Sequence, residues 1–122
     1  MTGKITPPRA VTGFFYVGAD VALQTIVAPA ANTKGIVVTA AHAFPRNDGT
    51  RSRVMAKTSA PASVTDTSAL TLAHSILLLN GAGQFFGGIA LPIVLPPGVG
   101  LYAQKDDVNV AGGFSCDYEL LA

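Results

Sequence analysis

Short runs of apolar and β-branched residues recur along this chain about every ten residues, and turn-forming residues separate them. The strands that this pattern predicts are 14–17, 21–28, 36–44, 53–58, 69–79, 89–95, 99–104 and 114–121. Such a spacing leaves no room for the crossover helices that parallel strands need. We therefore expect an all-β fold, a single antiparallel β-sandwich of about eight short strands, jelly-roll-like or Ig-like.

Segment 69–79 fits two structures. The strand interpretation rests on residues that share one face at period two, namely Leu70, Leu72, His74, Ile76 and Leu78. A helix, with Gly81 just after its end, rests on Ala69, Leu72, Ala73, Ile76 and Asn80. We favour the strand because its neighbours are strands, and the helix stays open. The glycine-rich stretch 81–88 that follows is predicted to be a turn.

Segment 89–95 is an apolar run broken by Pro92. Proline donates no hydrogen bond to a sheet, so this run is expected to be an edge strand, a bulged strand, or a strand packed at a subunit boundary. Its two faces are both apolar, with Ile89, Leu91, Ile93 and Leu95 on one and Ala90 and Val94 on the other. Pro97 followed by Gly98 predicts a type II turn, in which glycine takes the positive φ.

The composition points to self-association. The chain has 49% hydrophobic and 12% charged residues, whereas about 25% of an average soluble domain is charged. Few charges remain to cover the surface, so some apolar surface is expected to face another protein, and we predict a homo-oligomer, in particular a trimer. The net charge of +1 gives no basic footprint for nucleic acid. The candidate interface residues are Pro7, Pro8, Arg9, Ile89, Leu91, Pro92, Ile93 and Leu95.

Residues 1–12 show no core-forming period and contain the Pro7-Pro8 pair beside Lys4 and Arg9. Paired prolines favour extended geometry. We expect residues 1–12 to form an N-terminal arm that lies against a neighbouring molecule, and residues 13–122 to form the sandwich. The start of the chain lacks an apolar signal-peptide core, and no apolar run is long enough for a membrane span, so synthesis in the cytoplasm is expected.

The sequence offers no catalytic constellation, metal site or cofactor motif, and we expect no enzyme activity. His42 and His74 are predicted to be core or interface residues on apolar strand faces, and the single cysteine, Cys116, a small buried hydrophobe. Asp106 and Asp107 are expected in a solvated loop, with calcium binding as the alternative. The basic segment formed by Arg46, Arg51 and Arg53 is expected at an exposed hairpin tip, with an acidic partner surface as the alternative. Residues 81–88 match neither the dinucleotide fingerprint nor the P-loop.

Three stretches carry a resemblance to a known class of protein. They are the Asn-Thr-Lys-Gly turn (32–35) that leads into a Val-Val strand, Lys-Thr-Ser-Ala-Pro (57–61), and Leu-Pro-x-x-Leu-Pro-Pro-Gly-Val-Gly-Leu-Tyr (91–102). From about residue 20 onward the chain resembles small β-sandwich structural proteins of tailed-phage virions. The pattern carries over no functional residues.

The resemblance implies a virion component that is made in the host cytoplasm. Its expected role is a capsid decoration (cement) protein that binds the major capsid protein and stabilises the head lattice. The alternatives are a collar, tail or fibre accessory protein, or a receptor-binding module that recognises a host-surface sugar or protein.

Overall fold

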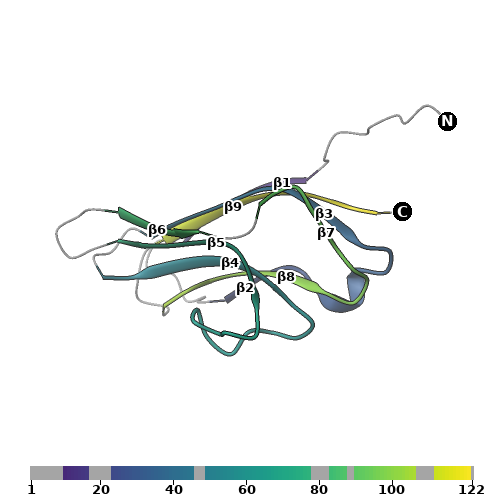
Figure 1. Cartoon of the computed structure of the whole chain (residues 1–122), viewed down its shortest axis with the longest axis horizontal. Coiled ribbons are helices and arrows are strands. Elements are labelled where there is room, and N and C mark those ends of the chain that lie inside the picture. The colour runs from purple at the N-terminus through teal and green to yellow at the C-terminus, as the bar shows by residue number, and fades with distance from the viewer. Residues whose placement is uncertain are drawn as a thin grey trace.

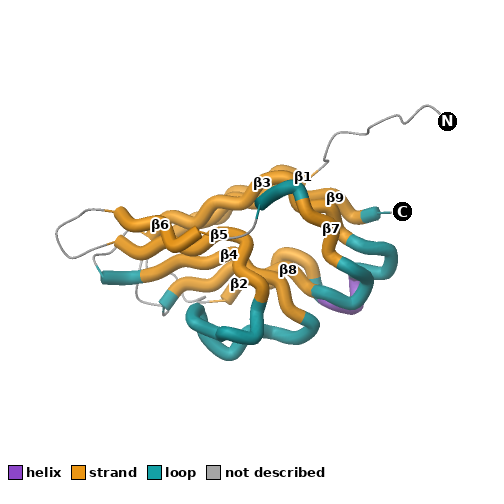
Figure 2. The backbone as a smooth tube through the Cα atoms, in the orientation of Figure 1, coloured by secondary structure: helices purple, strands orange, loops and turns teal. Residues whose placement is uncertain are grey.

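A computed structural model gives the fold of the chain and describes residues 10–16, 23–45, 49–77, 83–87, 90–106 and 112–121. Within these residues there are nine strands and one short 3₁₀ turn, Pro29–Ala31. The strands form two layers, with β1, β9 and β3 lying over β2, β8 and β4 (Figures 1 and 2). The predicted antiparallel β-sandwich is therefore confirmed.

One layer is a four-stranded sheet in the order β1-β9-β3-β7. Its strands are β1 (Ala10–Tyr16), β9 (Gly112–Leu120), β3 (Ile36–Pro45) and β7 (Ile93–Leu95). The other layer is a five-stranded sheet in the order β2-β8-β4-β5-β6. Its strands are β2 (Leu23–Val27), β8 (Gly100–Lys105), β4 (Arg51–Lys57), β5 (Leu70–Leu77) and β6 (Gly83–Gly87). Every pairing between these strands is antiparallel.

The core lies between the two sheets, where alternate side chains of each strand meet. The four-stranded sheet contributes Ile36, Val38, Ala43, Leu95, Phe114 and Cys116, and the five-stranded sheet contributes Val27, Val54, Ala56, Leu72, Ala73, Leu101 and Ala103. β3 crosses over β4 and β5, so the centre of each sheet packs on the centre of the other. In β4, Val54 and Ala56 face this core, as the period-two alternation of a strand requires.

Within segment 69–79 the structure describes residues 69–77, of which 70–77 form the strand β5, and this strand contains a bulge that the period-two pattern did not predict. The register with β4 shifts where Ala73 pairs with Val54 and Thr71 pairs with Met55. Leu72 and Ala73 consequently both face the core. A bulge changes the face on which later side chains lie. His74 therefore lies opposite Arg53, away from the core, and its predicted place on the apolar face was wrong.

Three predicted boundaries also change. The turn predicted for 81–88 contains β6, in which the aromatic pair Phe85-Phe86 favours a strand despite the flanking glycines. β1 begins at Ala10, within the stretch assigned to the arm. The strand predicted at 89–95 is reduced to Ile93–Leu95, which is an edge strand, the first of the three alternatives raised by Pro92. The peptide bond between Leu91 and Pro92 is cis.

Candidate functional site

A long loop, residues 58–69, covers the outer face of the five-stranded sheet and is held there by Arg53. Met55, Tyr102 and Ala69 form a small second apolar cluster beneath it. The guanidinium donates from Nε to Thr71 Oγ1 (2.9 Å), from Nη1 to the carbonyl oxygens of Val64 (3.1 Å) and Asp66 (2.7 Å), and from Nη2 to the carbonyl oxygen of Ala69 (2.9 Å). Arg53 is 5% exposed, so its predicted place at an exposed hairpin tip was wrong.

Asp66 fixes the same loop from within. Its carboxylate accepts hydrogen bonds from Lys57 Nζ (2.7 Å), from the amide of Ala62 (3.0 Å), and from both the amide (2.9 Å) and the hydroxyl (2.6 Å) of Ser68. The hydrogen bonds from Lys57 and Ser68, followed by the amides, hold the pKa of Asp66 well below its usual range. One arginine and one lysine of β4, together with one aspartate of the loop, therefore hold the loop in place.

A shallow polar pocket of about 340 Å³ lies beside this loop. It is lined by Arg53, Thr65, Asp66, Thr67, Ala69, Thr71 and His74. Burial lowers the pKa of His74, and the charges of Arg53 and Arg51 lower it further, whereas Asp106 opposes them. Arg53 and Asp66 already form hydrogen bonds with the loop, so the other polar groups that line this pocket are three threonine hydroxyls and the imidazole of His74.

Asn32 organises one end of the sandwich. Its Nδ2 donates to the carbonyl oxygens of Pro96 (2.8 Å) and Val99 (2.9 Å), and its Oδ1 accepts from the amide of Gly35 (2.7 Å). Its own carbonyl accepts from the amide of Gly98 (2.9 Å). Gly98 has φ of 87°, as the predicted turn requires. Three hydrogen bonds of one buried residue thus fix the turn between β7 and β8, and the fourth fixes the loop of Asn32 itself.

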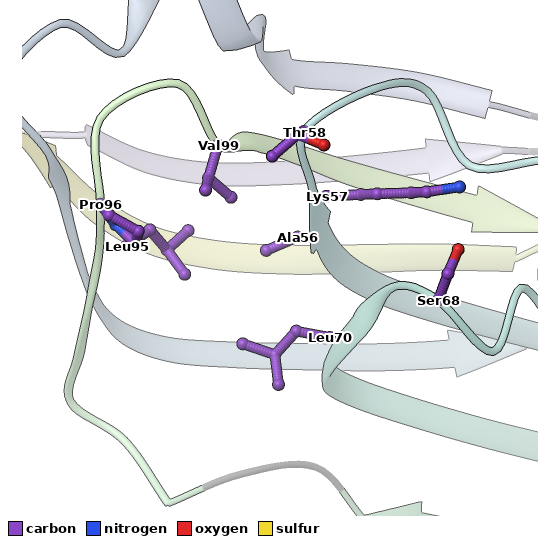
Figure 3. Close-up of a pocket in the computed structure, with 8 residues that line it drawn as sticks. All are labelled: Ala56, Lys57, Thr58, Ser68, Leu70, Leu95, Pro96 and Val99. Atoms are coloured by element: carbon purple, nitrogen blue, oxygen red, sulfur yellow. The ribbon is translucent and has the colours of Figure 1, made fainter.

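An apolar pocket of about 380 Å³ opens at this same end. Figure 3 shows Ala56, Leu70, Leu95 and Val99 around a shared space, with Lys57 and Ser68 to one side. The remaining lining residues are Thr58 and Pro96. Leu70 and Ala56 come from the five-stranded sheet and Leu95 from the four-stranded sheet, so the pocket is a gap between the layers.

The large hydrophobic side chains that are most exposed among the described residues lie towards this end of the sandwich, and one of them, Leu70, lines the pocket. They are Val94 (58%), Leu120 (47%), Leu70 (39%) and Leu121 (38%). Leu120 lies opposite Ile36, which is itself opposite Leu95. A Cβ atom built on Gly35 would lie 3.1 Å from Leu121 Cδ1 and 3.8 Å from Val94 Cγ1, which places those two side chains together. We call these four residues and the apolar pocket the docking end.

The candidate interface residues of segment 89–95 divide between core and surface. Leu95 is buried, and Leu91 and Ile93 are partly buried against the core. Pro92 is exposed. The exposed apolar side chain of this strand is Val94, which the pattern placed on its opposite face. Pro7, Pro8, Arg9 and Ile89 lie outside the described residues, as do Arg46 and Asp107.

Other residues singled out in the sequence have clear positions. Cys116 is buried in the core, where burial, with a smaller contribution from Asp117, raises its pKa to about 12. This agrees with its prediction as a small hydrophobe. His42 is exposed on the outer face of β3. Asp106 accepts a hydrogen bond from the Arg51 amide (2.8 Å).

Two kinds of site were also sought in the part of the chain that the structure describes. Its histidine, cysteine and acidic residues form no group of three or more that could hold a metal ion. None of its helical segments is long and apolar enough to cross a membrane.

Two residues that organise these sites were missed in the sequence. Asn32 appeared only as a turn residue, although an asparagine just before Thr-Lys-Gly signals a side chain able to bond nearby backbone. Arg53 was named only as part of the basic segment, although it shares its strand face with the apolar Met55. Neither feature of the sequence predicts which distant carbonyl groups the side chain binds.

No protein-family model, curated protein sequence or solved structure matches this chain.

Proposed function

We propose that this protein is a structural protein of a phage virion, and that it decorates the capsid by docking its apolar end on the head lattice. The observation that supports the proposal is the docking end itself. Val94, Leu120, Leu70 and Leu121 are the exposed large hydrophobic residues of the described chain. They lie towards one end of the sandwich, where Leu70 also lines the apolar pocket. Exposed apolar residues that cluster in this way mark protein interaction sites.

The framework around the docking end suits a rigid adaptor. Asn32 fixes the turn at 96–99, and Arg53, Lys57 and Asp66 fix the loop at 58–69. Because these contacts are formed before docking, little conformational entropy is lost on binding. A protein that binds the assembled lattice and not its loosened state stabilises the lattice by mass action, by about 2.7 kcal/mol at a hundredfold excess over Kd.

The test uses capsids that lack the protein. Heat survival of these capsids is measured without the protein, with the wild type, and with Val94→Glu and Leu120→Glu. The wild type should raise survival, and each variant should bind at least tenfold more weakly, because a carboxylate must then be desolvated in an apolar contact. Thr25→Glu, at an exposed position on β2, is the matched control and should bind like the wild type. Equal survival with and without the wild-type protein would reject cementing and favour the collar or tail-accessory alternative.

We also propose that the protein assembles as a homo-oligomer, in particular a trimer. The proportion of charged residues, 12%, supports this, because so few charges cover little of the surface. Light scattering at micromolar concentration tests the proposal, and a uniform monomer would reject it.

A receptor-binding module is the second candidate, and the polar pocket favours it. Thr65, Thr67 and Thr71 present hydroxyl groups beside His74, as recognition of a sugar would require. It ranks second because the chain has no tryptophan and three tyrosines to serve as stacking platforms. Binding to immobilised host-surface glycans, lost in Thr67→Val and retained in Val94→Glu, would place it first.

A further inference from the structure

The two sheets differ in what covers their outer faces. The loop 58–69 covers that of the five-stranded sheet, where Met55 and Tyr102 are buried. The outer face of the four-stranded sheet has no such cover from the described residues. There His42 is exposed, and Val37 and Ala40 are half-buried.

This open face carries two carboxylates on β9, which is one of its two central strands. Asp117 and Glu119, two residues apart on β9, lie opposite Ala40 and Val37 of β3. Both are half-buried. Among the described residues the ion pair is Lys57–Asp66, so neither carboxylate has a described cation as a partner. Apolar side chains flanked by two negative charges suit a segment that is both apolar and basic.

The first residues of the sequence have that chemistry. Residues 1–9 contain Lys4 and Arg9 together with Ile5, Pro7 and Pro8, and the first acidic residue of the sequence is Asp20. They lie outside the described residues, and the described chain begins at Ala10. Ala10 is opposite Tyr118, which is opposite Val38, so residues 1–9 join this sheet at the end where Glu119 lies.

Length and stereochemistry favour a second copy as the acceptor. Nine extended residues reach about 30 Å, whereas the four strands of the sheet span about 14 Å. Prolines disfavour the helical conformation for the residue before them, so Thr6-Pro7-Pro8 resists the sharp reversal that would return the segment onto its own sheet. An extended segment instead continues beyond the end of the sheet.

We propose that residues 1–9 of one copy lie across the outer face of the four-stranded sheet of a second copy, with Lys4 and Arg9 against Asp117 and Glu119. This inference rests on the proposed self-association and names the surfaces that carry it. Val94 of the docking end lies opposite Val37 on this same face, so the two contacts are neighbours. The charge substitutions used below leave the four apolar residues of the docking end unchanged, and capsid binding is therefore measured separately.

Charge reversal on the full chain tests the contact. One variant is Lys4→Glu with Arg9→Glu, and the other is Asp117→Lys with Glu119→Lys. Sedimentation velocity at low salt should show self-association about tenfold weaker in each, as expected for losing two exposed ion pairs and gaining repulsion. A 1:1 mixture of the two variants should recover wild-type association, because each segment then meets a face of opposite charge on the other chain. Lys34→Glu, which reverses an exposed loop lysine, should associate like the wild type.

The outcomes separate this proposal from its rivals. Self-association could recover when all four substitutions are combined in one chain but not in the mixture of the two variants. That result would mean that the segment lies on its own sheet, and it would overturn the proposal. Self-association within twofold of wild type in both variants would also overturn it. If the lysine substitutions prevent folding, Asp117→Asn with Glu119→Gln keeps the shape and should still weaken association severalfold. Capsid binding is measured in parallel: loss of self-association with retained capsid binding supports this contact, whereas loss of capsid binding alone counts against the proposed function.

Discussion

Arg53 Nη2 donates a hydrogen bond of 2.9 Å to the carbonyl oxygen of Ala69, which joins the middle of β4 to the last residue of the loop that covers it. Burial lowers the pKa of Arg53, and the charge of Asp66 opposes that effect. The guanidinium is charged at any physiological pH. It therefore acts as a permanent donor to three carbonyl groups of the loop. Those of Val64 and Ala69 are bound at buried positions, whereas that of Asp66 also accepts from the amide of Ala69 (3.4 Å).

Replacing Arg53 with methionine should destabilise the fold by about 3 kcal/mol. The methionine side chain is of similar length, but it has no hydrogen-bond donor for those carbonyl groups. Arg53→Lys should recover less than half of the loss, since an ammonium cannot reach carbonyl groups in the fork geometry of a guanidinium. Urea unfolding followed by circular dichroism measures both. Arg51→Met, on the same strand face and half-buried, should change the free energy of unfolding by about 0.5 kcal/mol or less. Similar losses in the two methionine variants would contradict the assigned role of Arg53.

Asp66 should make the fold sensitive to acid. Its pKa is held below the ordinary value of about 3.9, so the folded state keeps the carboxylate charged where the unfolded state takes up a proton. This contribution to stability is complete above about pH 5 and is lost as the pH falls through the folded pKa. Asp66→Asn should be less stable at neutral pH and should lose less stability than the wild type on acidification. Asp106→Asn, at an exposed carboxylate, is the control. If this control lost as little stability on acidification as Asp66→Asn, the assignment to Asp66 would be refuted.

His74 should give a separate dependence in a milder pH range. Burial and the nearby Arg53 and Arg51 lower its pKa in the folded state, so the unfolded state binds the proton more readily. Stability is then complete above the unfolded value of about 6.5 and falls as the pH drops below it. His74→Gln should flatten the curve of melting temperature between about pH 7 and pH 5. His42→Gln, at the exposed histidine of β3, should leave the curve unchanged; equal flattening in both variants would mean that His74 is not the responsible group.

Turn chemistry and strand periodicity were sufficient to predict the sandwich and the turn at Gly98, and they left the edge position of β7 as one of three alternatives. Both act within a few residues, where steric limits on φ decide the outcome. The bulge at Leu72 and Ala73 could not be predicted from the sequence, because it arises from how β5 pairs with β4. The missed burial of Arg53 has the same origin: its partners are carbonyl groups of a loop 11 to 16 residues away. The docking end likewise joins residues that are distant in the sequence.

Asn32 should be among the most sensitive polar positions. Asn32→Ala removes the donor to Pro96 and Val99 and the acceptor for Gly35, and should cost about 2–4 kcal/mol because these groups are left in a buried site. Asn32→Asp keeps the acceptor alone and should fall between alanine and the wild type. Thermal unfolding by calorimetry measures the order of the three proteins. Thr33→Ala, at the exposed neighbouring position, should behave like the wild type, and an Asn32→Ala protein as stable as Thr33→Ala would reject this role for Asn32.

The thiol of Cys116 should be unreactive toward disulfide reagents while the protein is folded. The thiolate is the reactive form of cysteine, and burial raises the pKa of this thiol to about 12. A disulfide reagent at pH 8 should therefore label Cys116 only as fast as the protein unfolds, and the rate should rise with urea. Ser115→Cys in a Cys116→Ala background supplies the comparison, since position 115 is half-buried on the outward side of the same strand and should react without unfolding. Cys116→Ser should destabilise the fold by about 1–3 kcal/mol, because a hydroxyl is buried among apolar side chains. Labelling of native Cys116 at the rate of the Ser115→Cys protein would show that the thiol is accessible, and would reopen a chemical role for it.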